Sequence, residues 1–295
     1  MHRSPKNENI YAKVISDSLH PNGVARLTTM ELQFHRFILP QVNTYRAWSR
    51  NSASSRAVPA KKNISSVLRN PAWPVYFGRN KSGMQSGEPL SEDEIRQIKH
   101  QYVKALRASA NAAIEMDRIG LHKEVINRIL EPYLWHRIIL SSTDFGNMFA
   151  QRIDEDAQPE FQELAKCMKL ALNDSNPTRL EYGQYHLPYL TDEDNSLSLE
   201  DKKKISIARC ARVSYLTHDK KRSIDKDIEL YNKLAKGAGV EMDEANDVEL
   251  GKHPHFSPME HVATPALETT ANFELFRQVR KDIEESYFKY LMLRN

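Results

Sequence analysis

Apolar and polar residues alternate in the first strongly patterned part of the chain. From Met30 to His35 every other residue is apolar, which is the period of a half-buried β-strand. We expect this strand to run on through Leu39 and to stop at Pro40. The next segment predicts a short helix from 41 to about 49 and then a loop, because Ser52–Ser55 is too rich in small polar residues to stay helical.

Later segments carry apolar residues at the spacing of an α-helix. The longest predicted helix begins with a capping box at Ser91–Glu94 and ends at Gly120. Further helices are predicted at residues 123–129 before Pro132, from Pro159 onward, between Ser223 and Gly237, and over 272–293. The run Ile138–Leu140 is a buried piece of undecided type, and irregular connections are expected at about 60–90 and 173–203.

Composition and charge are those of an ordinary globular protein. The 295 residues are 40% hydrophobic and 27% charged, and the sequence shows no internal repeat or clean linker. We therefore expect a single domain over residues 1–295. The net charge of +3 suits a small anionic ligand and is too weak for a protein that coats nucleic acid.

The two cysteines, Cys167 and Cys210, provide neither a disulfide framework nor a four-thiolate metal site. Cys167 lies beside Met168 on the apolar face of its predicted helix, which favours a core residue over a nucleophile. The polar N-terminal residues lack the apolar core of a signal peptide, and no apolar run approaches the length of a membrane span. We expect a cytoplasmic protein.

The segment from Gln41 to Arg56 holds the densest candidate chemistry. It combines three arginines with several hydroxyl and amide side chains directly after the predicted strand. Guanidinium forks and hydroxyl donors are suited to a phosphate and to a planar ring that carries carbonyl groups. The segment therefore indicates a site for an anionic ligand.

The spacing Arg46-x-x-Ser49-x-Asn51-x-x-Ser54-x-Arg56 resembles the arginine signature of the flavin-dependent thymidylate synthase (ThyX) family. Further blocks that resemble the family lie at Cys210–Tyr215, His255–His261, Arg128–Leu130 before Pro132, Asn147–Arg152 and Ala157–Glu160. In the family the first two of these precede the signature, whereas here they lie near the C-terminus. The chain thus resembles a circularly permuted, diverged member, and permutation is tolerated when the termini lie at the surface.

The resemblance implies an α+β fold with a central mixed or antiparallel sheet flanked by long helices. It implies reductive methylation of dUMP at C5, with the one-carbon unit from methylenetetrahydrofolate, the hydride from FAD, and NADPH as reductant. Family members are homotetramers with active sites at subunit interfaces, and we expect the same here, with loop 50–59 at the interface. A permuted biosynthetic enzyme of this kind would suit a phage genome.

The resemblance also implies roles for single residues. Arg152 matches the arginine that lies against the pyrimidine and would stabilise the charge that builds as C5 becomes nucleophilic. Gln41 matches the glutamine that reads the base. The residues matched to phosphate contacts are Ser54, Ser55, Arg56 and Arg128. Those matched to flavin contacts are Arg46, Asn51, Ser52, Asn147, His255, Ser257 and Glu260.

The sequence departs from the family pattern where the family contacts flavin. Thr44-Tyr45 replace an Arg-His pair, Ser52 replaces a glutamate, and no N-x-R occurs in residues 140–145. Two alternatives therefore stay open: a hydroxymethylase or methylase of dCMP or dUMP, and a non-catalytic homologue that binds nucleotides or nucleic acid. A metal site is a further alternative, but its spacing fits no standard zinc pattern; it would use His253, His255, Glu260 and His261.

Overall fold

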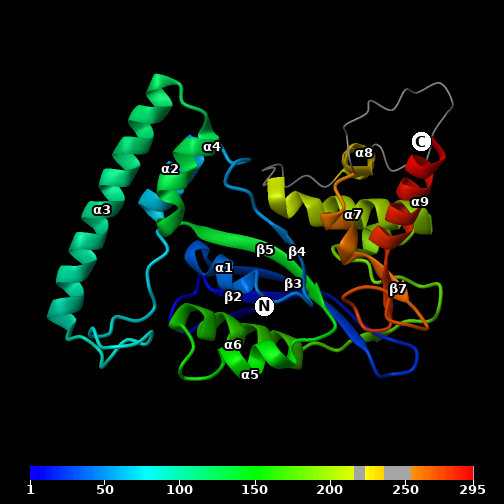
Figure 1. Cartoon of the computed structure of the whole chain (residues 1–295), viewed down its shortest axis with the longest axis horizontal. Coiled ribbons are helices and arrows are strands. Elements are labelled where there is room, and N and C mark those ends of the chain that lie inside the picture. The colour runs from blue at the N-terminus through cyan, green and yellow to red at the C-terminus, as the bar shows by residue number, and fades with distance from the viewer. Residues whose placement is uncertain (216–222, 236–253, 295) are drawn as a thin grey trace.

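A six-stranded sheet forms the centre of the computed structural model, which describes residues 1–215, 223–235 and 254–294 (Figure 1). The strand order is β1-β2-β3-β5-β4, every pair along this path is antiparallel, and β6 adds a short parallel pairing to β2. The strands are β1 (His2–Arg3), β2 (Tyr11–Leu19), β3 (Arg26–His35), β4 (Ser49–Ser52), β5 (Trp135–Ser142) and β6 (Thr178–Arg179). Together with the long helices this confirms the α+β fold.

The alternation in β3 places its apolar side chains on one face of the sheet. Met30, Leu32 and Phe34 are fully buried there against α6 (Pro159–Asn173). Helix α5 (Gly146–Arg152) joins β5 to α6 on the same side, below the sheet in Figure 1. The opposite face carries α7 (Leu199–Tyr215), so the core has two layers of helix around one sheet.

The segment after β3 differs from its prediction. The strand ends at His35, and the chain continues through the 3-10 turn η1 (Arg36–Ile38) into the one-turn helix α1 (Leu39–Val42). The helix predicted over 41–49 is therefore shorter, and Ser49–Ser52 form β4 instead of a loop. Pairing with β5, in which Asn51 faces Ile139, stabilises this strand, and local composition does not reveal such a partner.

A pair of helices lies beside the sheet, and α3 forms the left edge of Figure 1. The elements are α2 (Ala60–Arg69), α3 (Glu92–Ile119), α4 (Lys123–Ile126) and the 3-10 segment η2 (Asn127–Tyr133). The capping box of Ser91 and Glu94 and the left-handed Gly120 that ends α3 are both confirmed. The prediction of an irregular connection over 60–90 is wrong at its start, where the chain forms α2. Ile64 and Val67 of this helix pack against α3.

The C-terminal part covers the sheet on the side of α7, at the right of Figure 1. Its elements are α8 (Ile224–Ala235), η4 (Ser257–His261), β7 (Ala263–Pro265), β8 (Phe276–Gln278) and α9 (Val279–Arg294). Two predicted boundaries shift: α7 already begins inside the connection predicted for 173–203, and the last helix begins at Val279 because β8 occupies the residues before it. In the described part of the chain no helix combines the length and apolarity needed to span a membrane.

Candidate functional site

Arg152, the residue matched to the catalytic arginine, is the last residue of α5 and lies among polar and aromatic side chains. Its Nε donates to the Tyr45 hydroxyl at 2.8 Å, and its guanidinium lies over the Phe161 ring, 4.8 Å from the centroid. Its Nη1 lies 3.5 Å from Gln41 Oε1, and the Gln41 amide nitrogen donates to Gln158 Oε1. We call these five residues the Arg152 cluster.

The Arg152 guanidinium retains hydrogen-bonding capacity. It is half-buried, it forms no ion pair with any carboxylate of the described residues, and its Nη2 donates to none of their atoms. The Tyr45 hydroxyl donates to Gln151, so it accepts from Arg152 and fixes the direction of the guanidinium. A partly desolvated cation of this kind stabilises negative charge on a neighbouring ligand more strongly than one in water.

A second group of polar residues surrounds Glu131 in η2. Its Oε1 accepts from the Ser55 hydroxyl at 2.9 Å, from Arg128 Nη1 at 2.9 Å and from Arg36 Nη2 at 3.1 Å. Burial alone would raise the pKa of this carboxyl, but the Ser55 hydrogen bond and the two arginines outweigh it and lower the pKa. We call these four residues the Glu131 cluster; it unites Ser55 and Arg128, both matched to phosphate contacts.

The loop before α2 is fixed to α4 and η2 by hydrogen bonds to its backbone. The buried Asn127 donates to the carbonyl oxygens of Ser55 and Val58 at 2.6 and 2.9 Å, and Lys123 Nζ donates to Ala57 at 3.2 Å. Arg56 extends from this loop to Glu124 at 2.8 Å, but its side chain is 62% exposed. Exposed pairs contribute about 0–1 kcal/mol, so an anionic ligand can displace this carboxylate at little cost.

Several residues matched to flavin contacts instead hold the C-terminal part against β4. Asn51 Nδ2 donates to the carbonyl oxygen of Cys210 at 2.8 Å, and Ser257 Oγ donates to that of Arg50 at 2.8 Å. Glu260 forms an ion pair with Arg280. The structure therefore brings the blocks at 210–215 and 255–261 onto the arginine segment, although some 160 to 200 residues separate them along the chain.

The remaining predicted residues are exposed, or their polar groups form no hydrogen bond with the described residues. Arg46, Asn147 and His255 are exposed, and their side chains make no hydrogen bond or ion pair with described residues. Ser52 and Ser54 are half-buried, and their hydroxyls are likewise unused within the described part. Within the described part of the chain, a flavin would therefore find the guanidinium of Arg46, the amide of Asn147, the imidazole of His255 and the Ser52 hydroxyl available for contacts.

Neither cysteine is activated, and no metal site is formed in the residues described. Burial raises the pKa of Cys167 to about 12 and that of Cys210 above its usual range, so both thiols stay protonated at neutral pH. Among described residues no three His, Cys, Asp or Glu side chains converge on one point. His253, one residue of the alternative metal site, lies outside the described residues.

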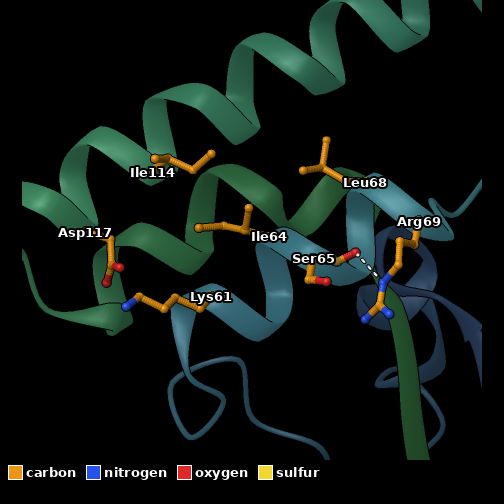
Figure 2. A pocket seen from close by; sticks show the side chains of 7 residues that line it. All are labelled: Lys61, Ile64, Ser65, Leu68, Arg69, Ile114 and Asp117. Atoms are coloured by element: carbon orange, nitrogen blue, oxygen red, sulfur yellow. Dashed lines mark hydrogen bonds between the residues drawn. The ribbon is translucent and has the colours of Figure 1, made fainter.

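Figure 2 shows a groove of about 390 Å³ between α2 and α3. Ile64, Leu68 and Ile114 provide apolar walls, and Lys61, Ser65, Arg69 and Asp117 surround them. The Arg69 Nε donates to the Ser65 carbonyl oxygen, which holds the guanidinium along its own helix. None of the residues predicted for nucleotide or flavin binding lines this groove.

Comparison with known proteins finds similarity in structure only. No protein-family model matches the chain, and no curated protein sequence is detectably similar to it. Among solved structures, the UMP/dUMP methylase PolB from Streptomyces cacaoi, bound with 5-Br UMP, is similar with a TM-score of 0.44 and 14% identity. The match covers 55% of this chain and 88% of that one. Likeness at this level assigns no activity to the chain.

The sequence assigned no role to three residues that organise these clusters. Glu131 links Ser55 to Arg128, Arg36 adds a second guanidinium from η1, and Gln158 fixes the Gln41 amide. Two of them have a sequence signal: Arg36 follows directly after the alternating strand, and Gln158 belongs to the block 157–160 that resembles the family. The placement of Glu131 depends on contacts that only the folded chain makes.

Proposed function

We propose that the chain methylates a uracil nucleotide, dUMP, at C5. The observation that carries the proposal is the Arg152 cluster: a half-buried guanidinium, with no carboxylate partner among the described residues, beside a fixed amide. Methylation at C5 requires this ring carbon to become nucleophilic, and enolate-like negative charge builds on a ring carbonyl oxygen before C5 attacks the electrophile. Arg152 would stabilise that charge through its free donors.

The Gln41 amide can contact the edge of a pyrimidine. Its nitrogen donates one hydrogen to Gln158, so its second hydrogen and its oxygen Oε1 remain to bind a base. Uracil offers N3–H as a donor and its carbonyl oxygens as acceptors, which match these two groups. Loss of one such hydrogen bond in a partly buried site leaves a polar group unsatisfied, which costs about 1–3 kcal/mol.

The Glu131 cluster supports phosphate binding near the base site. Arg36 and Gln41 lie five residues apart on the consecutive turns η1 and α1, so at about 1.5–2 Å per residue the backbone rises by roughly 8–10 Å between them. The separation suits a nucleoside monophosphate, in which the sugar spaces phosphate and base. Ser54, Arg56 and Arg128 would donate to the phosphate, which displaces the exposed Glu124 from Arg56, and Ser55 would exchange its hydrogen bond to Glu131 for one to the phosphate.

The cofactors follow from the resemblance. Bound FAD would supply the hydride that completes the methyl group, with methylenetetrahydrofolate and NADPH as co-substrates. Arg46, Asn147 and His255 are the exposed matched residues whose polar groups have no partner among the described residues. Because all three are exposed, we expect a neighbouring subunit of a homotetramer to complete the flavin site.

Release of tritium from C5-labelled dUMP, in the presence of methylenetetrahydrofolate, FAD and NADPH, tests the proposal. We expect release by the wild-type chain and a large loss in Arg152→Gln. The matched control is Arg118→Gln, which removes an exposed arginine of α3 whose one ion pair with the described residues is to Glu115. Release from labelled dCMP but not dUMP would favour the cytosine enzyme, and release from neither, with FAD failing to bind, would refute the proposal.

A further inference from the structure

A row of hydroxyl side chains crosses the sheet on the face opposite α6. Ser16, Thr29, Ser141 and Ser49 stand directly opposite one another on β2, β3, β5 and β4. Thr29 and Ser141 are fully buried, and their hydroxyl oxygens lie 2.6 Å apart. A row of buried polar groups in a sheet is costly unless each group has a hydrogen-bond partner.

Two fully buried histidines extend this row at either end. His186 Nε2 lies 2.7 Å from Thr29 Oγ1, and its Nδ1 lies 2.8 Å from Ser18 Oγ on β2. His261, the last residue of η4, places its Nδ1 2.8 Å from Ser141 Oγ. The result is one continuous chain of contacts, Ser18–His186–Thr29–Ser141–His261, which joins β2 to η4.

The two ends of this chain differ. At the β2 end, the buried Ser18 and the half-buried Ser16 line a groove of about 430 Å³, and the Ser16 hydroxyl lies 3.4 Å from the same His186 Nδ1. At the other end, His261 Nε2 is buried and has no hydrogen-bond partner among the described residues. The ring nitrogen is buried and has no hydrogen-bond partner there, although the contacts along the rest of the chain are hydrogen-bonded. Such a nitrogen indicates a position where a proton is taken up or released.

The contacts allow only two arrangements of protons that use every hydrogen bond. In the first, Ser18 donates to His186, His186 Nε2 to Thr29, Thr29 to Ser141, and Ser141 to His261 Nδ1, so both histidines carry their proton on Nε2. In the second, every bond is reversed and both carry it on Nδ1. Any mixed arrangement leaves a hydroxyl proton without an acceptor or two lone pairs facing each other.

We propose that this chain is a proton relay between the groove beside β2 and η4, which carries the block matched to flavin contacts. A proton that enters at His261 Nε2 shifts each proton of the second arrangement by one bond, and one proton leaves from the Ser18 hydroxyl to the groove. The product is the first arrangement, so charge and atoms balance. The proposal rests on the proposed function for its proton source, which is a proton released by the reaction at the flavin site.

The surroundings favour transfer through neutral side chains. Burial lowers the pKa of both His186 and His261 to about 3, so neither stays charged at neutral pH. Asp17 is the carboxylate that acts on His186, and it is held by Arg26 and by the Thr28 hydroxyl outside the relay. The backbone of His186 pairs with Ala263, which holds the ring in place between β2 and β3.

Nitrogen NMR of histidine-labelled protein tests the relay without any substrate. We expect His186 and His261 to show the same neutral tautomer in the full chain at neutral pH. Ser141→Ala should change the ring-nitrogen shifts of His261, and Ser142→Ala, equally buried on β5 but bonded to Asp144, should leave both histidines unchanged. Opposite tautomers in the wild type, or unchanged His261 shifts in Ser141→Ala, would overturn the relay.

A kinetic measurement tests its use in catalysis. Thr29→Val keeps the shape of the side chain but removes the hydroxyl, and we expect tritium release to fall roughly 100-fold, while Thr29→Ser restores it. Full activity in folded Thr29→Val would overturn the role of the relay. If the wild type releases no tritium but the two tautomers agree, the proposed function fails and the proton chain itself stands.

Discussion

Arg209 is the most heavily bonded cation in the described part of α7, and its replacement tests how α7 is held. Its side chain is 8% exposed and contacts two buried carboxylates: Nη1 and Nη2 donate to Asp194 at 2.6 and 2.9 Å, and Nε donates to Asp227 at 2.9 Å. Nη1 also donates to the Tyr189 carbonyl oxygen at 3.0 Å. The network ties α7 to the segment before it and to α8.

Arg209→Met removes the cation but keeps an unbranched apolar side chain. The Asp194 carboxylate is then buried without a counter-charge, whereas Asp227 retains Arg212. Breaking a buried pair in this way costs about 3–5 kcal/mol. We expect the free energy of unfolding, from urea denaturation, to fall by that amount, and the double variant with Asp194→Asn to recover part of it.

The pH dependence gives an independent estimate of the same network. Hydrogen bonds from Arg209, supported by those from Thr191, lower the pKa of Asp194 from 3.8 to about 2. A lowered acid pKa stabilises the fold above about pH 4, and this contribution, about 2 kcal/mol, is lost as the pH falls to about 2. Asp194→Asn should remove that part of the acid sensitivity.

The exposed pair of Arg118 with Glu115 provides the control. Its side chains are 73% and 59% exposed, and such pairs contribute about 0–1 kcal/mol. Arg118→Met should therefore leave the unfolding free energy nearly unchanged. If Arg209→Met costs no more than Arg118→Met, the network does not hold α7 and the reasoning is refuted.

Three further predictions concern catalysis, the core and a helix end. Arg152→Lys keeps the charge but loses the fork, and kcat for tritium release should fall roughly 100-fold; an unchanged kcat would contradict its role. Leu32→Ala, at a fully buried position, should cost about 2–5 kcal/mol in urea denaturation, whereas Leu267→Ala, at an 86% exposed one, should stay within about 0.5 kcal/mol. Gly120→Ala should cost about 1 kcal/mol because φ is +92° there, and Gly146→Ala, without a positive φ, should not.

The parts of the fold that local sequence determines were predicted well. The capping box at Ser91 and the end of α3 at Gly120 depend on residues within one turn, and the alternation from Met30 to His35 depends on the burial of one strand face. The strand β4 was missed because its stability comes from pairing with β5, which lies far along the chain. Helix α2 was missed because the prolines and glycines after it dominated the composition of the window.

The candidate site shows the same division. The resemblance pointed to Ser55 and Arg128, and the structure places both on Glu131, a residue whose role no local pattern reveals. Gln41 and Arg152 are both predicted site residues, and the structure places them close together. The fixed direction of the Gln41 amide depends on Gln158 and on tertiary packing. The roles of all these residues in binding remain predictions that the tritium assay decides.

The position of β4 at the edge of the sheet has a consequence for synthesis of the chain. Ser257 of η4 covers this edge by donating a hydrogen bond to the Arg50 carbonyl oxygen. Helix α7 covers it through the hydrogen bond from the Asn51 side chain to the Cys210 carbonyl oxygen. Ribosomes add about 5–20 residues per second, so the edge stays open for on the order of 10 s after β5 emerges. An open edge strand is a template for pairing with other chains. Protein truncated before α7 should therefore aggregate more readily than the full chain.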